Sequence, residues 1–303
     1  THQSIGKAGI TPDHIQRALK ELVLSDEILE QLGVAAASGK PLFLYGPAGN
    51  GKTVICQCLG RIWPDEILVP YAIYVDGQVI QVFDEITHGR SEGAALGAER
   101  TDRRWVRCHR PVVTVGGELT LDMLDLAYKA TLKYFEAPLQ LKANNGVFIV
   151  DDFGRQQISP QELLNRWIIP LETRQDFLRL RTGQKFAVPF DQFIIFATNL
   201  EPRTLVDEAF LRRLRSKVKV DYVNRTQFAE IFRRCCDQYH MEFDPKAVEY
   251  LLTRYYDNDQ RPLTACHPRD LLEQILDYCR FHQLAPRLTA ENLDRACQSY
   301  FVA

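Results

Sequence analysis

The sequence has 303 residues, of which 46% are hydrophobic and 25% charged, and its formal net charge at pH 7 is −2. These values are those of ordinary globular proteins, and the length predicts one large domain or two smaller ones. The charge excludes a general attraction to nucleic acid but is compatible with a local basic patch. No apolar run approaches the roughly 18 residues that span a bilayer, and the N-terminal residues lack the pattern of a signal peptide. We therefore expect a cytoplasmic protein without a membrane segment.

The cysteines are scattered through segments with a helical pattern. The close pair Cys56 and Cys58 lacks the C-x₂-C spacing of a zinc site. We interpret all eight as buried free thiols: Cys56, Cys58, Cys108, Cys235, Cys236, Cys266, Cys279 and Cys297.

Two helical segments open the chain. TPDHIQRALKELV places Thr11 as the cap of a helix and Pro12 at its first helical position. SDEILEQLGVAAASG is capped by Ser25 and ends near Gly39. A short apolar strand, residues 41–45, then leads through a Gly-rich turn into a further helix from Lys52 to about Leu59.

Two β-hairpins are predicted from alternating patterns and turn residues. YAIYVDGQVIQVF alternates apolar and polar residues on both sides of Asp76-Gly77, a strong hairpin signal. FLRLRTGQKFAV, residues 177–188, predicts a second hairpin that turns at Thr182-Gly183. Between the hairpins, residues 119–135 (LTLDMLDLAYKATLKYF) have the amphipathic pattern of one helix.

Continuous apolar runs predict buried parallel strands. These runs are VFIV (147–150) and FIIFAT (193–198). The segment between them, SPQELLNRWIIPLE, starts with a capping box of Ser159 and Glu162 and predicts a helix.

After Val223 the composition changes to a series of four helical segments. Asn224, Asp244 and Thr289 stand where their N-caps should be. We therefore expect a domain boundary here. The predicted parts are an N-terminal linker and helix (1–24), an α/β core (25–223) and a helical subdomain (224–303).

The turn after the first strand matches G-x-x-x-x-G-K-[ST] between a strand and a helix, the context that a phosphate-binding loop requires. Backbone N–H groups of such a loop surround a β-phosphate, the lysine reaches the β and γ oxygens, and the hydroxyl ligates Mg²⁺. The alternative is a Gly-rich turn without a ligand. The predicted nucleotide-binding residues are Gly46, Pro47, Ala48, Gly49, Asn50, Gly51, Lys52, Thr53 and Val54.

Two carboxylates follow the strand over residues 147–150. A phosphate-binding loop needs a second strand that ends in an acid, and Asp151 fits the Mg²⁺ side of such a site, together with Thr53. Asp152 would then orient or deprotonate the attacking water. The alternative is a solvated turn without a catalytic role.

These residues resemble the AAA+ ATPases from about residue 20 to the C-terminus, with GPAGNGKT as Walker A and VFIVDD as Walker B. The resemblance implies a P-loop NTPase fold: a parallel β-sheet sandwiched by helices, with the four C-terminal helices as an α-helical lid. It also implies ATP and Mg²⁺ as cofactors. FIIFATN is similar to the sensor 1 strand, which assigns Asn199. EAFLRRL is similar to the arginine-finger segment, which assigns Arg213 with Arg212 as the alternative, and CHPRDLL to sensor 2, which assigns Arg269. Without the resemblance, Arg212 and Arg213 are interpreted as part of a solvated basic run with Arg215 and Lys217.

The order of acidic strand end, helix, hairpin and sensor strand is most similar to MoxR-type ATPases of the branch with a hairpin before sensor 1. That branch often carries an insert in the second core helix, to which residues 113–136 correspond in position.

One residue departs from the family pattern. The family has glutamate where this chain has Asp152, so the carboxylate is shorter by one methylene, roughly 1.3 to 1.5 Å of reach. Misplacement on that scale costs on the order of a hundredfold in rate. Slow hydrolysis is therefore expected.

The sequence contains one basic cluster with an embedded aromatic residue. ERTDRRWVRCHRP, residues 99–111, holds five arginines around Trp105. It would bind an acidic protein or a nucleic-acid backbone, with Trp105 as a stacking surface, or else form a subunit interface or a solvated face. No helix-turn-helix or zinc-finger pattern supports sequence-specific DNA recognition.

The resulting hypothesis is an ATP-hydrolysing AAA+ module that forms a homo-oligomeric ring, with six subunits expected, and remodels a protein client or companion subunit. Two alternatives remain. One is a slowly hydrolysing, ATP-dependent switch or scaffold. The other is a DNA-associated motor that uses residues 99–111.

Overall fold

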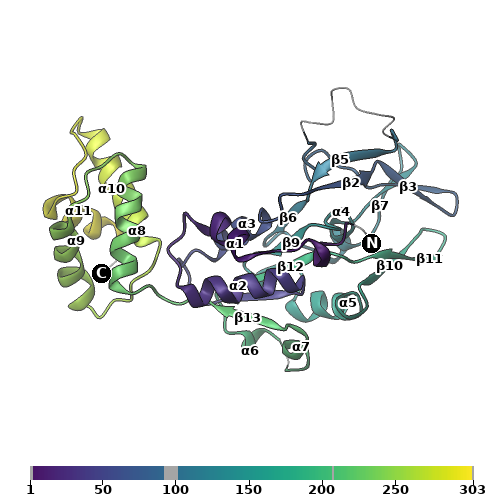
Figure 1. The fold of residues 1–303 in the computed structure, drawn as a ribbon, viewed down its shortest axis with the longest axis horizontal. Coiled ribbons are helices and arrows are strands. Elements are labelled where there is room, and N and C mark those ends of the chain that lie inside the picture. The colour runs from purple at the N-terminus through teal and green to yellow at the C-terminus, as the bar shows by residue number, and fades with distance from the viewer. Residues whose placement is uncertain (1–2, 92–101, 207, 302–303) are drawn as a thin grey trace. The chain divides into compact units, whose positions relative to one another are not determined.

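The computed structural model describes residues 3–91, 102–206 and 208–301 (Figure 1). The chain divides into two compact units, which are described separately. The first consists of Thr1–Leu19, Asp26–Tyr45 and Lys52–Lys219. The second consists of Lys20–Ser25, Gly46–Gly51 and Val220–Ala303.

A parallel five-stranded sheet forms the centre of the first unit. Its spatial order is β13-β1-β12-β9-β6, and every neighbouring pair is parallel. Its strands are β1 (Leu42–Tyr45), β6 (Val112–Val115), β9 (Val147–Val150), β12 (Phe193–Thr198) and β13 (Ser216–Lys219). Every residue of β9 and β12 is buried, which confirms the prediction from their continuous apolar runs.

The strand register brings three strand ends together. Phe196 of β12 pairs with Val150 of β9, and Thr198 pairs with Tyr45 of β1. Asp151 and Asn199 therefore leave the same edge of the sheet. This carboxyl edge is where open α/β sheets bind their ligands.

Helices cover the sheet, as the α/β prediction requires. They are η1 (Ile5–Lys7), α1 (Pro12–Leu19), α2 (Asp26–Ser38), α3 (Lys52–Gly60), α4 (Leu139–Lys142), α5 (Pro160–Thr173), α6 (Pro202–Leu205) and α7 (Glu208–Arg213). Helices α2 and α3 contact β13 and β12, respectively. Trp167 of α5 packs edge-on against Phe148 of β9 at 5.2 Å between ring centroids. Aromatic burial of this kind dominates the energetics of a core.

The predicted capping box of α5 is confirmed. Ser159 Oγ accepts the Glu162 amide at 3.3 Å, and the Glu162 carboxylate accepts the Ser159 amide at 3.1 Å. A cap of this kind contributes about 1 kcal/mol, and it holds α5 in the connection between β9 and the hairpin before β12.

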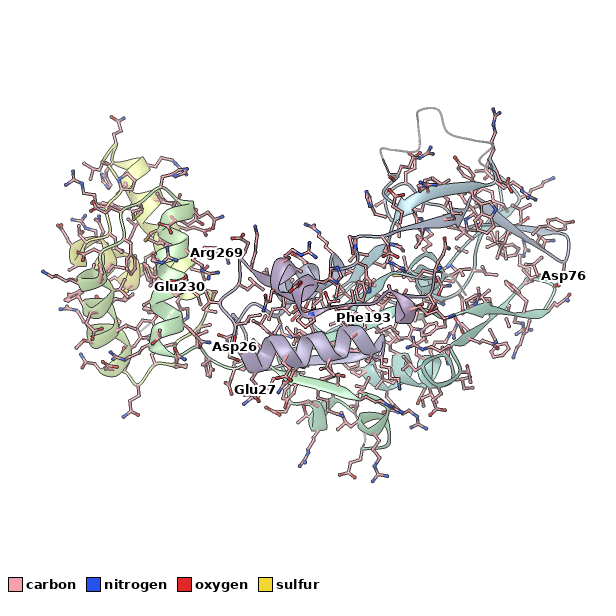
Figure 2. The ribbon with its side chains drawn as sticks, viewed as in Figure 1. Asp26, Glu27, Asp76, Phe193, Glu230 and Arg269 are labelled. Atoms are coloured by element: carbon pink, nitrogen blue, oxygen red, sulfur yellow. The ribbon has the colours of Figure 1, made fainter. Side chains whose placement is uncertain are left out.

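Small β-sheets are inserted between α3 and β9. One pairs β2 (Glu66–Pro70) with β5 (Trp105–His109), and the other has the order β3-β4-β8-β7. The latter strands are β3 (Ala72–Val75), β4 (Gln78–Gln81), β7 (Ala127–Lys129) and β8 (Tyr134–Glu136). The predicted hairpin is confirmed, and Asp76 lies at the tip of its two strands (Figure 2). Asp76 and Gly77 have φ of 46° and 80°, as a type I′ turn requires.

The helix predicted over residues 119–135 is wrong. The segment forms a short 3₁₀ helix, η3 (Leu121–Leu124), and then strands β7 and β8. Leu124 packs in the core of the central sheet, whereas Phe135 packs in a separate cluster of the inserted sheets. A single straight helix cannot serve two cores, and pairing with β4 fixes the second half as strand.

The hairpin before β12 is confirmed. It pairs β10 (Gln175–Arg179) with β11 (Lys185–Pro189), and the Gly183 amide donates to the Leu180 carbonyl at 2.9 Å. At its base, Asp176 is 1% exposed and pairs with Arg166 at 2.6 Å. A buried carboxylate needs such a partner.

The second unit is helical. It contains α8 (Arg225–Gln238), α9 (Pro245–Leu251), the π-helix η4 (Leu252–Asp257), α10 (His267–Phe281) and α11 (Ala290–Tyr300). The predicted N-caps are confirmed: Asn224, Asp244 and Thr289 each accept a backbone amide with the side chain. All eight cysteines are free thiols, as predicted, but Cys58, Cys235 and Cys266 are only partly buried. None of the described helices is long and apolar enough to cross a membrane.

Candidate functional site

The first element of the site joins a helix start to a strand end. Thr53, the second residue of α3, donates from Oγ1 to Asp151 Oδ2 at 2.8 Å. The two residues are 98 positions apart in sequence, and they meet because β1 and β9 both flank β12 with their carboxyl ends at one edge. A hydroxyl and a carboxylate at this distance suit Mg²⁺, which also keeps waters and phosphate oxygens as ligands.

Lys52 adds a positive charge beside this pair. The residue is 7% exposed. Burial lowers the pKa of Lys52 from its ordinary value, while the nearby carboxylates of Asp152 and Asp151 oppose that shift. A buried ammonium at a helix N-terminus is suited to an incoming polyphosphate, which would compensate for the lost hydration.

The loop Gly46–Gly51 belongs to the second unit. Asn50, which is 4% exposed, accepts the Ala265 amide at 3.0 Å and donates to the carbonyls of Pro47 and Ala48 at 3.3 Å. The Cys266 amide donates to the Gly49 carbonyl at 2.9 Å. The sequence predicted only that Asn50 lines the loop. Its hydrogen bond with Ala265 is a long-range contact that the sequence does not reveal.

Two glycines of this loop leave no room for a side chain. A Cβ on Gly46, at φ 139°, would lie 2.1 Å from the Val220 carbonyl oxygen. A Cβ on Gly49, at φ 78°, would lie 2.8 Å from Cys266 Sγ. Gly46 and Gly49 are thus required by the backbone conformation and by close neighbours.

Asp152 follows Asp151 in an unusual backbone conformation. Its φ is 50°, in the left-handed region, and its amide donates to Asp151 Oδ1 at 3.1 Å. Asn199 Nδ2 donates to Asp152 Oδ1 at 3.2 Å. The structure therefore brings Asp151, Asp152 and Asn199 together.

Gln156 is a part of the site that the sequence interpretation missed. Its Nε2 donates to the carbonyls of Asp151 at 2.8 Å and Asp152 at 3.2 Å, and its Oε1 accepts the Gly154 amide at 2.8 Å. The turn is also attached to β12, because the Phe153 amide donates to the Ala197 carbonyl at 2.7 Å. A glutamine a few residues after a strand carries no periodic signal by which it could have been found.

Arg213 is the last residue of α7, and its guanidinium Nε lies 2.5 Å from Glu172 Oε1 of α5. Arg212, the alternative, is exposed at the same helix end. The structure does not bring either arginine into the cluster formed by Thr53, Asp151 and Asn199.

Arg269 lies in the first turn of α10 (Figure 2). It lies 3.3 Å from Asp270 and 3.8 Å from Glu273, and its side chain is 55% exposed. The two carboxylates offset the unfavourable position of a cation at a helix N-terminus. More than half of the guanidinium-bearing side chain remains accessible to an anion.

In the described part of the basic cluster, residues 102–111, the arginines do not form one surface. Arg110 is 7% exposed and pairs with Asp65 at 2.5 Å, so it does not contribute to an exposed basic surface. Arg104 pairs with Asp102 at 2.6 Å. Trp105 is exposed on β5, whereas Arg100 lies outside the described residues. Arg110 directly follows β5 and continues its alternation of exposed and buried residues, so its side chain is buried whereas those of Arg107 and His109 are exposed.

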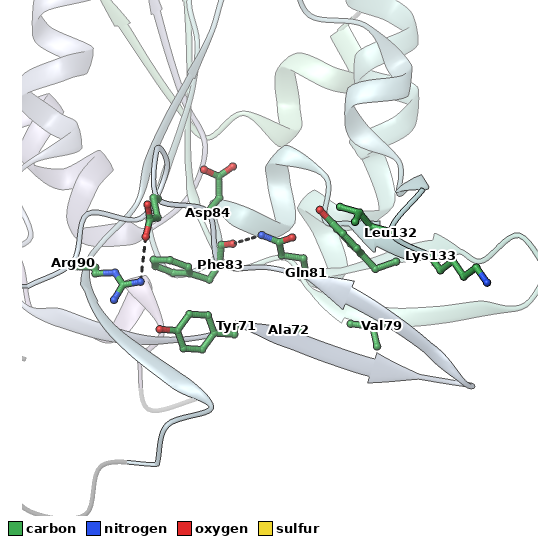
Figure 3. Close-up of a pocket in the computed structure, with 11 residues that line it drawn as sticks. Tyr71, Ala72, Val79, Gln81, Phe83, Asp84, Arg90, Leu132 and Lys133 are labelled. Atoms are coloured by element: carbon green, nitrogen blue, oxygen red, sulfur yellow. Dashed lines mark hydrogen bonds and ion pairs between the residues drawn. The ribbon is translucent and has the colours of Figure 1, made fainter. Parts of the chain in front are cut away.

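A groove of about 690 Å³ lies on the inserted β-sheets (Figure 3). Tyr71, Phe83 and Leu132 line it with Arg90, which pairs with Glu85 at 3.2 Å and lies over the Phe83 ring at 5.1 Å. None of the predicted site residues lines this groove. Of its charged lining residues, Asp84 pairs with Lys142 of α4 at 2.6 Å, and Lys133 is exposed.

A metal site made of protein ligands alone is absent from the part of the chain that the structure describes. No group of three or more His, Cys, Asp or Glu residues could hold a metal ion there. Thr53 and Asp151 fit the alternative, in which a nucleotide supplies further oxygen ligands to Mg²⁺.

Sequence comparison matches only the C-terminal part of the chain to a family. Residues 224–299 match a family described as a domain of unknown function, DUF8689. A comparison with curated proteins found no match.

Solved structures are more informative about the fold. The chain is similar to NtrX from Brucella abortus in complex with ADP, with a TM-score of 0.53 and 16% identity over 91% of this chain and 56% of that one. It is similar to the Holliday junction branch migration motor RuvB of Thermotoga maritima, with a TM-score of 0.53 and 13% identity over 91% of this chain and 69% of that one. The chain is also similar to domain III of the T. maritima replication initiation protein DnaA, with a TM-score of 0.50 and 14% identity over 97% of this chain and 100% of that one. The chain thus spans just over half the length of NtrX.

These three proteins have the AAA+ form of the P-loop NTPase fold. The parallel sheet of this chain has helices on its faces and the order β13-β1-β12-β9-β6. The chain therefore has the fold of the AAA+ P-loop NTPases.

Proposed function

We propose that the protein binds MgATP and hydrolyses it. The observation that carries the proposal is the 2.8 Å contact between Thr53 and Asp151, with the buried Lys52 beside it at the start of α3. Sequence position alone does not require that these groups meet. Together they supply the hydroxyl, the carboxylate and the ammonium that a nucleoside triphosphate and its Mg²⁺ need. NtrX, which has a similar fold, has been solved in complex with ATP.

The residues divide between binding and chemistry. Gly46–Gly51 and Val54 surround the phosphates, Lys52 binds the β and γ oxygens, and Thr53 with Asp151 holds Mg²⁺. Asp152 orients the attacking water. Asn199, at 3.2 Å from Asp152, keeps that carboxylate in place.

Two arginines are proposed as further phosphate ligands. Arg269, with an exposed guanidinium, serves as sensor 2. Arg213, at the end of α7, serves as a finger that acts on the nucleotide of a neighbouring subunit, which requires a homo-oligomeric ring. Since phosphoryl transfer depends mainly on positioning and charge stabilisation, such an arginine is worth on the order of 10³- to 10⁵-fold in rate.

We further propose that the ring, with six subunits, remodels a protein client in the manner of MoxR-type ATPases. The hairpin β10–β11 directly before β12 supports this assignment, since it follows α5 in the order of that branch. NtrX, RuvB and DnaA share only the fold with this chain, so their partners do not transfer to it.

A slowly hydrolysing switch is the second candidate. Asp152 is shorter than the glutamate of the family, and Asn199 already engages one of its oxygens. A DNA-associated motor is less well supported. RuvB is a branch migration motor, but two of the arginines that suggested a nucleic-acid surface here, Arg104 and Arg110, are paired with acids, and Arg110 is also buried.

The steady-state ATPase rate per protomer, measured over a series of protein concentrations with Mg²⁺, tests the proposal. Specific activity that rises with concentration supports hydrolysis in a ring. ATP binding with negligible turnover at every concentration supports the switch. Absence of ATP binding to the wild-type chain by calorimetry would overturn both.

A further inference from the structure

The turn after β9 carries both acids of the proposed site. Asp152 has φ 50° and Gly154 has φ 106°, so two of its four residues are in the left-handed half of backbone space. For a residue with a Cβ this costs on the order of 1 kcal/mol. The conformation of Asp152 persists only if its surroundings favour it, and that conformation determines where its carboxylate points.

One side chain makes three contacts within this turn. Gln156 Nε2 donates to two successive carbonyls, of Asp151 at 2.8 Å and Asp152 at 3.2 Å, while Gln156 Oε1 accepts the Gly154 amide at 2.8 Å. A terminal amide can do this because it has donors and an acceptor on one plane. No other natural side chain of the same length offers both.

We propose that Gln156 is a positioning residue for hydrolysis, which acts by holding the Asp152 carboxylate at the water-orienting position. The inference rests on the proposed function. Asn199 fixes the tip of the Asp152 side chain, and Gln156 fixes the backbone from which the side chain starts. Asp152 has only one methylene between backbone and carboxylate, so its side chain compensates for a backbone shift less than a glutamate would. A displacement near 1 Å costs on the order of a hundredfold in rate.

Contacts to the nucleotide are expected to be independent of Gln156. Thr53 reaches Asp151 through the carboxylate Oδ2, and the Asp151 amide is held by the Val115 carbonyl at 2.8 Å. Loss of Gln156 therefore leaves the strand end in place and releases the turn beyond it. This predicts a change in kcat without a comparable change in nucleotide affinity.

Gln156→Ala tests the inference with Gln157→Ala as a matched control, because Gln157 is an exposed glutamine at the adjacent position. In Gln156→Ala we expect kcat to fall about 10- to 100-fold, with ATP affinity changed by less than about twofold. Gln156→Glu keeps the length of the side chain but lacks the amide donor, and its kcat is expected to fall by a similar factor. Gln157→Ala should retain wild-type kcat.

A double-mutant cycle separates positioning from general structural damage. In an Asp152→Asn background, measured by single turnover, Gln156→Ala should have no further effect, because residues that act as a unit are not additive. The same fold loss in both backgrounds, or no loss in wild type, would overturn the inference.

Hydrogen exchange at the Gly154 amide distinguishes this inference from the proposed function. If the wild-type chain binds ATP but hydrolyses none, hydrolysis fails as the proposed function and the catalytic role of Gln156 fails with it. Faster exchange at Gly154 in Gln156→Ala would still verify the three-contact geometry, whereas unchanged exchange would overturn that geometry independently of any activity.

Discussion

Glu172 at the end of α5 holds Arg213 at the end of α7, with 2.5 Å between Glu172 Oε1 and Arg213 Nε. The side chains are 51% and 35% exposed, respectively. A pair so accessible to water contributes about 0 to 1 kcal/mol. The contact is therefore strong enough to orient the guanidinium and weak enough to be exchanged for a phosphate.

Arg213→Ala is predicted to reduce kcat on the order of 10³-fold or more, because an arginine finger stabilises charge that develops in the transition state. Arg212→Ala is the matched control and should retain activity within a few-fold. Both are measured at a protein concentration that saturates specific activity. A large loss in Arg212→Ala alone would reverse the assignment.

Lys52→Ala is predicted to abolish tight ATP binding in calorimetry, because the lysine supplies the charge that faces the β and γ oxygens. Thr53→Ala should instead leave binding of ATP without Mg²⁺ nearly unchanged and weaken the Mg²⁺ dependence of turnover. If Lys52→Ala binds ATP as the wild type does, the site is elsewhere.

Asp152→Glu is predicted to raise kcat, by up to about a hundredfold, because it restores the missing reach towards the attacking water. Nucleotide affinity should remain unchanged. Asp152→Asn serves as the comparison and should hydrolyse more slowly than either carboxylate. A decrease in Asp152→Glu would mean that the turn has placed the shorter aspartate at the working distance.

Asn50→Ala is predicted to lower the free energy of unfolding by about 1 to 3 kcal/mol, since it leaves the partly buried amide of Ala265 without its acceptor. Asn50→Asp keeps that acceptor and should lower the free energy of unfolding by less. Thermal unfolding with and without ATP measures both effects. Equal losses in the two variants would show that the Ala265 contact contributes little.

Glu230 provides a pH-dependent test of the second unit. Hydrogen bonds from Arg233 and Arg234 lower the pKa of Glu230 to about 2, whereas the pKa of glutamate in an unfolded chain is about 4.3. Since the folded state binds the proton less tightly, the stabilisation is complete above about pH 4.3 and is lost as the pH falls towards 2.

Glu230→Gln should therefore show a smaller decrease in stability between pH 5 and pH 2 than the wild type, by a few tenths of a kcal/mol to about 1 kcal/mol for so exposed a carboxylate. Denaturant unfolding at a series of pH values measures the difference. Identical pH profiles would exclude a contribution from this group.

Much of the local structure follows from the sequence. Asp76-Gly77 specified a type I′ hairpin, Ser159 and Glu162 a capping box, and the apolar run 193–198 a buried strand, because each signal depends on residues within a few positions of one another. The helix predicted over residues 119–135 was wrong because its structure depends on distant contacts. An amphipathic pattern does not show which of two hydrophobic cores each half of the segment will join.

The sequence by itself determined the phosphate-binding motif, the acidic strand end and the helix caps, since these depend on local backbone chemistry. Only the tertiary structure decided that Thr53 meets Asp151, that Arg110 is buried against Asp65, and that Gln156 holds the turn on which Asp152 lies. The physical reason is that these contacts depend on strand order and register. Both are set by the packing of whole elements, and no short window of sequence contains that information.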